Sequence, residues 1–498
     1  MTPASWFSWL LPALLALPLG AAVLLGWLGQ RRGAELLNLG FSVLGFALAC
    51  VLGVAVAVQG PLLALGSQLY ADSLSTYLVL LTCFVAAGTA AFSVPYMRFE
   101  QAAGRLGGQR LRLYHALFQL FVFTMLLALL SNNLGLLWVA MEAATLSTVL
   151  LVSLYRTPAG LQAAWKYFIV CGVGLALALF GTVLVYAAAE RVLGGQGAQA
   201  LLWTRLDAAR GALEPAAMSV AFVFVLVGYG TKVGLVPLHS WLPDAHAEGP
   251  TPVSAVLSGL LLNVALYAVL RLRVLVEGSV HAAWPGLLLQ GFGVLSVVVA
   301  ALMLWRQDDA KRLFAWSSIE HMGLASFGFG LGTPLAVFGA LLHLCVHALT
   351  KSAIFFSVGH ASQKAGSSRI DAIRGLRERS PALGWVLLLG ALGIVGLPPF
   401  GVFVSEFLIL GSAVQAAPWS VVPLLLGLLV ALAAVLWRAQ AMVFGRSQQG
   451  ELRTLAQRPW LVPAWLHLAL VVLLGVWIPG IAVAAWHAAA TVLAGGAA

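Results

Sequence analysis

The sequence predicts an all-α polytopic membrane protein with about fourteen transmembrane helices. Two observations on composition predict this class: 61% of the 498 residues are hydrophobic and only 9% are charged, whereas soluble domains carry roughly 25% charged residues. A third observation is that the apolar residues form consecutive runs of about 20 or more, the length that crosses a bilayer as a helix. Almost the whole chain is therefore expected to lie within a membrane.

Taken in order, the apolar runs place the fourteen helices and divide the chain into four parts. The helices are expected at 5–29, 34–58, 69–94, 113–131, 133–155, 162–189, 216–240, 251–276, 281–304, 311–331, 333–361, 383–411, 420–445 and 461–491. The first run is too long for the apolar core of a signal peptide, so we expect a retained helix. Helices one to three occupy 1–112, and the last helix occupies 446–498. Between them lie 113–276, with helices four to eight, and 281–445, with helices nine to thirteen.

Lysine and arginine are distributed unevenly over the loops. Twenty of the 27 fall in odd-numbered loops, five fall in even-numbered loops, and two, Lys232 and Lys351, lie inside helices. Because loops rich in Lys and Arg stay on the inner side of a membrane, both termini are expected to face outward, which is the periplasm for a bacterial inner membrane. The net charge of +10 includes no basic patch with interleaved aromatic residues, so nucleic acid is not an expected partner.

The four cysteines each stand alone inside apolar runs. Cys50, Cys83, Cys171 and Cys345 show no C-x-x-C spacing, which argues against an iron–sulfur cluster, a zinc site or a disulfide framework. The sequence also contains no nucleotide or haem motif. We therefore expect no cofactor in this chain and no energy source of its own.

Two of the expected helices carry Gly and Pro beside an ionisable residue. In helix seven the run Gly-Leu-Val-Pro237 follows Lys232, and in helix twelve the run Gly-Leu-Pro-Pro399 precedes Glu406. Proline removes a helix hydrogen bond and frees carbonyl groups that must face protein or water instead of lipid. Two interrupted helices five spans apart favour an inverted repeat, in which helices 4–8 and 9–13 are related by a pseudo-two-fold axis in the membrane plane. The alternative is that proline breaks are common and that the spacing is a coincidence.

Lys232 lies well inside an otherwise apolar run. An ammonium near the bilayer midplane costs roughly 2.5–3.5 kcal/mol on insertion scales, so a retained one indicates function. We expect Glu142, at mid-depth of helix five, to be its partner, because a carboxylate near an ammonium stays charged. A proton arriving nearby could break the pair. The alternative is a static salt bridge, although buried pairs stabilise poorly compared with apolar replacements.

Helix eleven carries three titratable residues at a spacing of four. His343, His347 and Lys351 should lie on one helical face, as a row about 12 Å long. Imidazole titrates near neutrality and can relay protons through water. Zinc is the competing interpretation, but no third ligand stands at H-E-x-x-H spacing and the ammonium would oppose a cation.

Helices ten and twelve add three more ionisable residues. Glu320 and His321 belong to the run Ser-Ser-Ile-Glu-His, and Glu406 follows Phe-Val-Ser. With the residues above, they are expected to form a lateral line of polar groups through the bundle at mid-membrane. A lone buried histidine is usually a satisfied core residue, whereas eight ionisable groups on five helices favour function.

Other polar residues near helix ends have simpler interpretations. Asp72 and Lys166 are close enough to the interfaces for snorkelling to explain them, and we expect Asp72 to be structural. A further set follows helix seven on the inner side and either gathers protons at a mouth or caps and solvates a loop. This set is His239, Asp244, His246 and Glu248.

Several motifs give the chain a clear resemblance to a known family over roughly residues 70–445. They are Lys232 followed by Val236-Pro-Leu-His-Ser-Trp-Leu-Pro-Asp-Ala-His246 and Gly249-Pro-Thr-Pro-Val-Ser254, Ala310-Lys-Arg-Leu-Phe-Ala-Trp-Ser-Ser-Ile-Glu-His-Met-Gly323, His343 to Lys351, and Gly396-Leu-Pro-Pro-Phe400 with Glu406. On these motifs the chain resembles the antiporter-like subunits of respiratory complex I and of Mrp-type sodium/proton antiporters. Within the family it is most similar to component F of hydrogenase-4.

The resemblance implies a fourteen-helix fold and proton translocation coupled to a redox reaction in partner subunits. The iron–sulfur, nickel–iron or flavin centres would lie in a peripheral module, beside other membrane subunits. The resemblance also implies that Glu142 and Lys232 form the charge pair. His321 and His347 would connect the two halves, and Glu406 would serve the outlet side.

The chain departs from the family on helix eight, where Ser258 and Asn263 stand instead of a histidine or lysine. A link between the halves would then use water and hydroxyl groups, or Lys351. We also expect the chain to end near helix fourteen, without the long lateral helix that one branch of the family carries. Two alternatives remain open: a component of a sodium/proton antiporter, or a scaffold subunit that conducts nothing.

Overall fold

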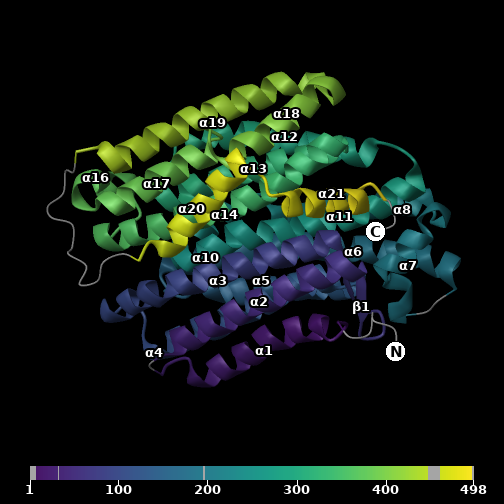
Figure 1. Ribbon diagram of the computed structural model, residues 1–498, viewed down its shortest axis with the longest axis horizontal. Helices are drawn as coiled ribbons and strands as arrows, with labels where there is room; N and C mark the ends of the chain where they lie inside the picture. The colour runs from purple at the N-terminus through teal and green to yellow at the C-terminus, as the bar shows by residue number, and fades with distance from the viewer. Residues whose placement is uncertain (1–6, 32, 195–196, 447–459, 496–498) are drawn as a thin grey trace.

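The computed structural model shows a bundle whose long helices run side by side along one direction (Figure 1). The first two residues expected in helix one, and Arg32, Arg453 and Arg458 of the loops, lie outside the residues that it describes. The described residues are 7–31, 33–194, 197–446 and 460–495.

The helices follow one another along the chain with few other elements between them. The helical elements are α1 (Leu10–Leu28), α2 (Ala34–Gln59), α3 (Ser73–Ala102), α4 (Gly108–Leu130), α5 (Leu134–Val152), α6 (Pro158–Leu193), η2 (Gly197–Leu201), α7 (Trp203–Ala208), η3 (Arg210–Ala212), α8 (Pro215–Val233), α9 (Leu242–Glu248), α10 (Thr251–Val256), η4 (Leu257–Leu261), α11 (Leu262–Val280), α12 (Trp284–Leu304), α13 (Ala310–Leu331), α14 (Pro334–Ala365), α15 (Ile370–Ile373), α16 (Leu376–Arg379), α17 (Pro381–Ile394), α18 (Gly401–Ala416), α19 (Pro418–Phe444), α20 (Val462–Val476) and α21 (Gly480–Leu493). The strands are β1 (Leu62–Ala64) and β2 (Leu69–Ala71), which pair antiparallel.

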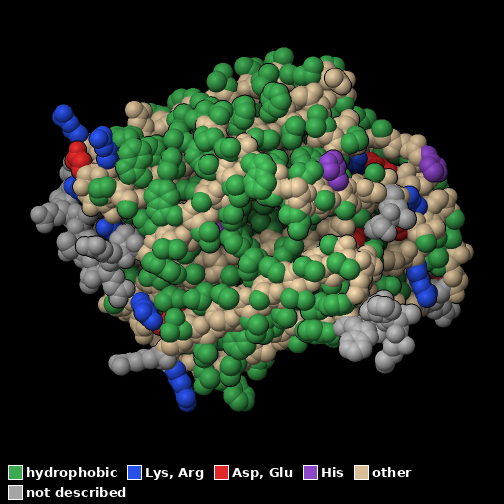
Figure 2. Space-filling model, in the orientation of Figure 1, with side chains coloured by type: hydrophobic (Ala, Val, Ile, Leu, Met, Phe, Trp, Pro, Cys, Tyr) green, Lys and Arg blue, Asp and Glu red, His purple; other side chains and the backbone are tan. Residues whose placement is uncertain are grey.

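An apolar outer surface surrounds the bundle. Eleven helices of the described residues are long and apolar enough to cross a membrane, or twelve if α20 and α21 form one bent span. Large apolar side chains such as Val54 and Leu429 are 64% and 60% exposed on their outer faces. Figure 2 shows hydrophobic side chains over the middle of the face in view, with lysines and arginines toward its two ends. The prediction of a multi-pass, all-helical membrane protein is therefore confirmed.

Three of the expected helices differ from ordinary spans. Helix ten corresponds to α13, which is 22 residues long but carries Lys311, Arg312 and Glu320. Helix twelve corresponds to two shorter apolar helices, α17 and α18, of 14 and 16 residues. Helix fourteen was expected as one segment, but α20 and α21 meet at 80°. The break falls just before Pro479, which caps α21, and proline is compatible with the start of a helix but not with its interior.

The breaks expected from Gly and Pro are present. Helix α8 ends at Val233, and Gly234 follows with φ +82°, a left-handed conformation that favours glycine. The chain then turns before α9 begins. Helix α17 ends at Ile394 and is followed by Gly396 at φ +70°. The first residues of the first break, Gly234 to Val236, are buried, whereas Pro237 and both prolines of the second break, Pro398 and Pro399, are exposed.

Asp72 does not snorkel, contrary to the sequence interpretation. Helix three was expected from residue 69, but Leu69–Ala71 forms β2, and Asp72 is the N-cap of α3 in a capping box with Ser75. Its side chain is fully buried and forms an ion pair of 2.7 Å with Arg271 of α11, which is also buried. A buried carboxylate needs such a partner, so Asp72 ties α3 to α11. This buried ion pair agrees with the structural role that we expected for Asp72.

Pairs of glycines let helix backbones approach closely around the core. A Cβ atom at Gly228 of α8 would lie 2.5 Å from the carbonyl oxygen of Gly174 on α6. A Cβ atom at Gly293 of α12 would lie 2.6 Å from that of Gly323 on α13. Small residues at such positions are what allows tight packing between helices in a bilayer. The two close contacts fix α6 against α8 and α12 against α13, next to the buried ionisable residues.

Candidate functional site

Lys232 lies in the last turn of α8, directly before the break at Gly234, and is fully buried. Its ammonium donates a hydrogen bond of 2.8 Å to the hydroxyl of Tyr167 on α6 and lies 4.8 Å from the centre of that ring. The Tyr167 hydroxyl is 2.8 Å from the hydroxyl of Thr148 on α5. Trp241 stacks on the Tyr167 ring at 4.5 Å. The lysine is thus held by a phenol that links it to a second hydroxyl.

Glu142 of α5 lies near Lys232 without touching it. The two side chains interact electrostatically, but the ion pairs among the described residues do not include them. Glu142 is only partly buried, whereas Lys232 is fully buried. The sequence suggested a direct charge pair between Glu142 and Lys232. In the structure the Lys232 ammonium instead bonds to the hydroxyl of Tyr167, which in turn contacts Thr148 of α5.

Three histidines meet between α13 and α14: His343 and His347, which the spacing on helix eleven placed on one face, and His321 of α13. Nδ1 of His321 is 3.1 Å from Nε2 of His343, and the centre of the His321 ring is 5.5 Å from that of His347. Nδ1 of His343 is also 2.9 Å from the hydroxyl of Ser405 on α18. All three rings are buried. Neutral imidazoles can donate with one nitrogen and accept with the other, so the cluster can pass a proton from α13 through α14 to α18.

Lys351 continues the row on α14 and is fully buried. Its ammonium donates a hydrogen bond of 2.8 Å to the backbone carbonyl of Phe314 on α13. Glu320 of α13 is the acidic group that interacts with it electrostatically. The row of His343, His347 and Lys351 is therefore inside the protein along its whole length, and each member faces α13.

Glu406 of α18 lies at the break between α17 and α18, with 8% of the residue exposed. Its carboxylate rests on Gly396, where any Cβ atom would overlap it. Glu320 interacts with it electrostatically. The left-handed glycine thus makes room for the acid, and Glu406 lies on the same helix as Ser405, which contacts the histidine cluster.

Expected helix eight corresponds to α10, η4 and α11. Where the family resemblance led us to look for a histidine or lysine, it carries Ser258 and Asn263. The hydroxyl of Ser258 is 2.8 Å from that of Ser318 on α13. Asn263 donates to the Gly259 carbonyl at 3.0 Å, and its side-chain oxygen has no protein partner. Ser258 lies in η4, a π-helical turn, and such turns occur often at functional sites. Helix eight is therefore joined to α13 by a pair of hydroxyls.

His246 lies buried inside the bundle, although the sequence left it either at an inner mouth or in a capped and solvated loop. The ring is fully buried, stacks on Phe355 of α14 at 5.2 Å, and neither nitrogen has a protein partner. It interacts electrostatically with Lys311 and Lys351. Buried nitrogens of this kind normally bond to ordered water. The spacing could have revealed this, because residues two apart on a helix face opposite sides, and Asp244 faces outward.

Asp244 and Glu248 line an open cavity of about 590 Å³ at one end of the bundle, as the mouth interpretation suggested. Asp244 forms ion pairs with Lys166 at 2.8 Å and with Arg312 at 2.9 Å. Lys166 keeps 40% of its side chain exposed, in agreement with a place near an interface. Within the ranges that the structure describes, no group of three or more His, Cys, Asp or Glu side chains is arranged to hold a metal ion.

Comparison with known proteins relates this arrangement to a family. Residues 131–436 match the family described as NADH:quinone oxidoreductase/Mrp antiporter, TM. The hydrogenase-4 component F homolog of Methylacidiphilum infernorum (isolate V4) is 47% identical over 469 residues, which are 94% of this chain and 96% of that protein.

Solved structures show the same fold. A chain of the membrane-bound sulfane sulfur reductase, an archaeal respiratory membrane complex, superposes with a TM-score of 0.86 at 24% identity and covers 97% of both chains. A chain of respiratory complex I from Thermus thermophilus with bound NADH gives a TM-score of 0.81 at 24% identity, over 96% of this chain and 99% of that one. Because the match spans more than half of the sequence and the 47% identical relative spans nearly all of it, this chain belongs to the NADH:quinone oxidoreductase/Mrp antiporter family of membrane subunits.

Proposed function

We propose that the chain is a proton-translocating membrane subunit of a redox-driven complex, of the hydrogenase-4/formate hydrogenlyase or NADH:quinone oxidoreductase type. One observation carries this proposal: buried titratable and hydroxyl side chains on several helices form hydrogen-bonded groups inside the bundle. These groups are Thr148, Tyr167 and Lys232, Ser258 and Ser318, and His321, His343 and Ser405. In this proposal the buried residues His246, Glu320, His347, Lys351 and Glu406 connect them. Ionisable residues retained at such depth mark proton or ion paths.

The energy for transport comes from partner subunits in this proposal. Moving one proton against 100 mV requires about 2.3 kcal/mol. The relatives include a hydrogenase-4 component homolog, and a solved structure with the same fold belongs to complex I. We therefore assign the iron–sulfur, nickel–iron or flavin centres to a peripheral redox module, and the conducting residues to this chain and its membrane neighbours.

The proposal also includes the number of membrane spans, the inverted repeats and the orientation in the membrane. We infer fourteen spans by adding α13, the broken pair α17 and α18, and the bent pair α20 and α21 to the eleven long apolar helices. The two interrupted helices support inverted repeats over 113–276 and 281–445. The excess of arginine and lysine in odd-numbered loops supports an orientation with both termini on the periplasmic side of a bacterial inner membrane.

The test is proton pumping by the whole complex reconstituted into vesicles, read with a pH-sensitive dye while the redox reaction runs. Lys232→Ala and Glu142→Gln are expected to reduce pumping severely with the redox activity and subunit content retained. Lys364→Ala is the matched control, since Lys364 is only half-buried and bonds to Ser380 away from the site. Glu190→Gln is the control for Glu142, because Glu190 is exposed at the end of α6. Unchanged pumping in both test variants contradicts the proposed path.

A second candidate is a component of a Mrp-type sodium/proton antiporter, which the description of the matching family favours. The same residues would then exchange protons for sodium without a redox module. Sodium pulses applied to vesicles that hold only this protein and its membrane partners distinguish the two. A sodium-dependent pH change in the absence of any redox substrate supports the antiporter, and a pH change that requires the redox substrate supports the first proposal.

A further inference from the structure

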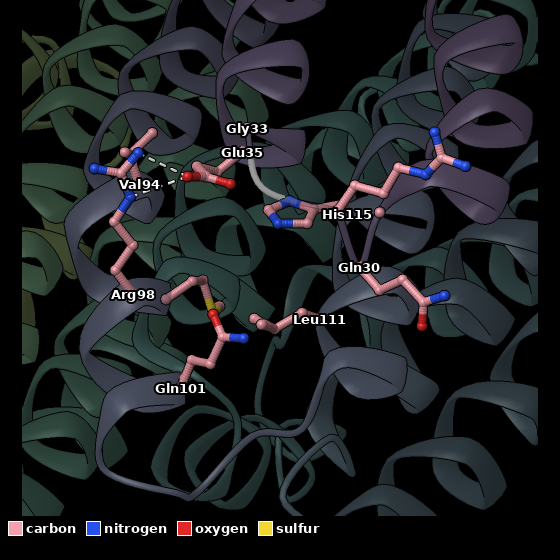
Figure 3. Close-up of a pocket in the computed structure, with 11 residues that line it drawn as sticks. Gln30, Gly33, Glu35, Val94, Arg98, Gln101, Leu111 and His115 are labelled. Atoms are coloured by element: carbon pink, nitrogen blue, oxygen red, sulfur yellow. Dashed lines mark hydrogen bonds and ion pairs between the residues drawn. The ribbon is translucent and has the colours of Figure 1, made fainter.

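A polar pocket outside the proposed proton path lies among the first four helices. Its volume is about 310 Å³, and the end of α1, the start of α2, the second half of α3 and the start of α4 surround it. Figure 3 shows the side chains that enclose it. The polar residues among them are Gln30, Arg31, Glu35, Arg98, Gln101 and His115.

His115 indicates that the pocket takes a ligand. Its ring is 2% exposed, and Nδ1 has no hydrogen-bond partner. Figure 3 shows the imidazole projecting into the same space as the side chains of Glu35 and Leu111. A buried ring nitrogen without a partner is unfavourable unless something else bonds to it. His115 takes no part in the line of groups between Lys232 and Glu406, so the proposed function leaves it unexplained.

The charges around the pocket favour an anion. Arg98 donates from Nε and Nη2 to one oxygen of Glu35, at 2.9 and 2.7 Å, so these two charges balance. Arg31 forms no ion pair with any residue that the structure describes. One positive charge therefore remains uncompensated, beside the amide groups of Gln30 and Gln101. Arg105, between α3 and α4, and Arg110 and Arg112, in the first turns of α4, lie at the same end of these helices.

The surface beside the pocket is apolar and suits acyl chains. Trp27, at the end of α1, is 79% exposed, and Leu36 and Leu37, at the start of α2, are 54% and 44% exposed. Tryptophan and arginine at helix ends are typical of the level of lipid headgroups. Basic pockets between transmembrane helices on the arginine-rich side bind phospholipid headgroups. We propose that this pocket binds the phosphate group of an anionic phospholipid, with His115 and Arg31 contacting the headgroup and the acyl chains lying along α1 and α2.

The test is lipid retention by the full chain, or its purified complex, measured by native mass spectrometry after incubation with phosphatidylglycerol or phosphatidylcholine. Wild type is expected to retain phosphatidylglycerol in preference. Arg31→Gln should weaken retention about fivefold, the effect of one arginine near an anionic lipid surface, and His115→Phe should weaken it as well. Glu35→Gln should strengthen retention, because Glu35 is the one acidic side chain among the described residues that line the pocket. Arg110→Gln is the matched control, since Arg110 lies at the same end of α4 but bonds to the Tyr155 carbonyl, outside the pocket.

Opposite signs for Arg31→Gln and Glu35→Gln cannot arise from misfolding, which would lower retention in both. Equal retention in wild type, Arg31→Gln and Arg110→Gln overturns the proposal. A second experiment adds inorganic phosphate to the lipid-loaded protein and measures by native mass spectrometry how much lipid remains bound. If phosphate displaces the lipid completely at micromolar concentration, the ligand is a free anion and the lipid assignment is wrong.

Discussion

Lys232 and Lys351 are both fully buried ammonium groups on long helices, but they bond to different kinds of acceptor. Lys232 donates to the hydroxyl of Tyr167, and Lys351 donates to the backbone carbonyl of Phe314. A phenol accepts a hydrogen bond and offers a proton of its own, whereas a carbonyl only accepts. The first half of the molecule can therefore pass a proton through the group that holds its lysine. In the second half, transfer has to use the neighbouring histidines and Glu320.

The acidic residues of the two halves differ in how deeply they are buried. Glu142 is partly exposed on the wall of the bundle, while Glu320 and Glu406 are buried. A partly exposed carboxylate within the apolar band is accessible to whatever packs against α5. The second half instead keeps its two acids buried, as are its three histidines. The acid of one half is therefore partly exposed, and the acids of the other half are enclosed by protein.

The largest effect is expected for Lys351→Met, which leaves Glu320 without its nearby ammonium. If the second half conducts through this group, proton pumping should fall roughly a hundredfold, the lower range for loss of a group that takes part in proton transfer. The measurement is dye-monitored pumping in vesicles. Lys364→Met on the same helix is the control and should pump like wild type. Pumping within twofold of wild type in Lys351→Met would show that this lysine only anchors α14.

Gly396→Ala tests whether the break in the second half needs its special backbone. The left-handed conformation costs a residue with a Cβ atom about 1–2 kcal/mol, and the added methyl group also displaces Glu406. We expect a lower thermal unfolding temperature in detergent and weaker pumping. Gly411→Ala, in the regular part of α18 with open space around it, should be neutral or slightly stabilising. Equal behaviour of the two variants contradicts the assigned role of Gly396.

Tyr167→Phe removes the group that distinguishes the first half. It leaves the ring over Lys232 and the stacking on Trp241, but it deletes two hydrogen bonds of 2.8 Å. A lost hydrogen bond to a charged group corresponds to about 1.5–3 kcal/mol, so pumping should fall roughly tenfold or more. Tyr186→Phe on the same helix is the matched control. If Tyr167→Phe pumps normally, the phenol only positions the lysine and the two halves are more alike than we infer.

The smallest effect is expected at the junction between the halves. Ser258→Ala breaks the contact with Ser318 and should lower pumping by a factor of about 2–5, as expected for one neutral hydrogen bond. Because Ser258 and Ser318 share one bond, the double variant should lose no more than either single variant. Additive losses would mean that the two hydroxyls act separately. The readout is the initial rate of vesicle acidification at equal redox turnover.

The sequence predicted the membrane fold and most of the buried groups because both depend on local pattern. Apolar runs and isolated lysines, histidines and glutamates can be recognised one helix at a time. The relation of Glu142 to Lys232 could not be predicted, because it depends on how far α5 and α8 lie apart once Tyr167 fills the space between them. The partner of Asp72 was missed for the same reason, since Arg271 is 199 residues away in sequence.

Other differences arise where one short element changes direction. His246 was grouped with Asp244, either at a mouth or in a capped loop, but the seven-residue helix α9 turns the two side chains to opposite sides. The bend between α20 and α21 was missed although Pro479 and Gly480 mark it, because helix fourteen was assigned as one apolar run. The charge asymmetry of the pocket at His115 also required tertiary structure, because four helices contribute to it.

The π-helical turn η4 (Leu257–Leu261) determines which neighbouring helices the side chains of expected helix eight can contact. In regular α-helical winding, positions five apart point about 140° away from each other. A turn that closes from residue i to i+5 is wound more loosely and brings such positions closer together in azimuth. Ser258 and Asn263 are five apart, and they reach α13 and α14. Shortening this turn by one residue would restore ordinary winding and swing one of them toward the opposite wall, so the local pitch of a single span keeps both contacts aligned.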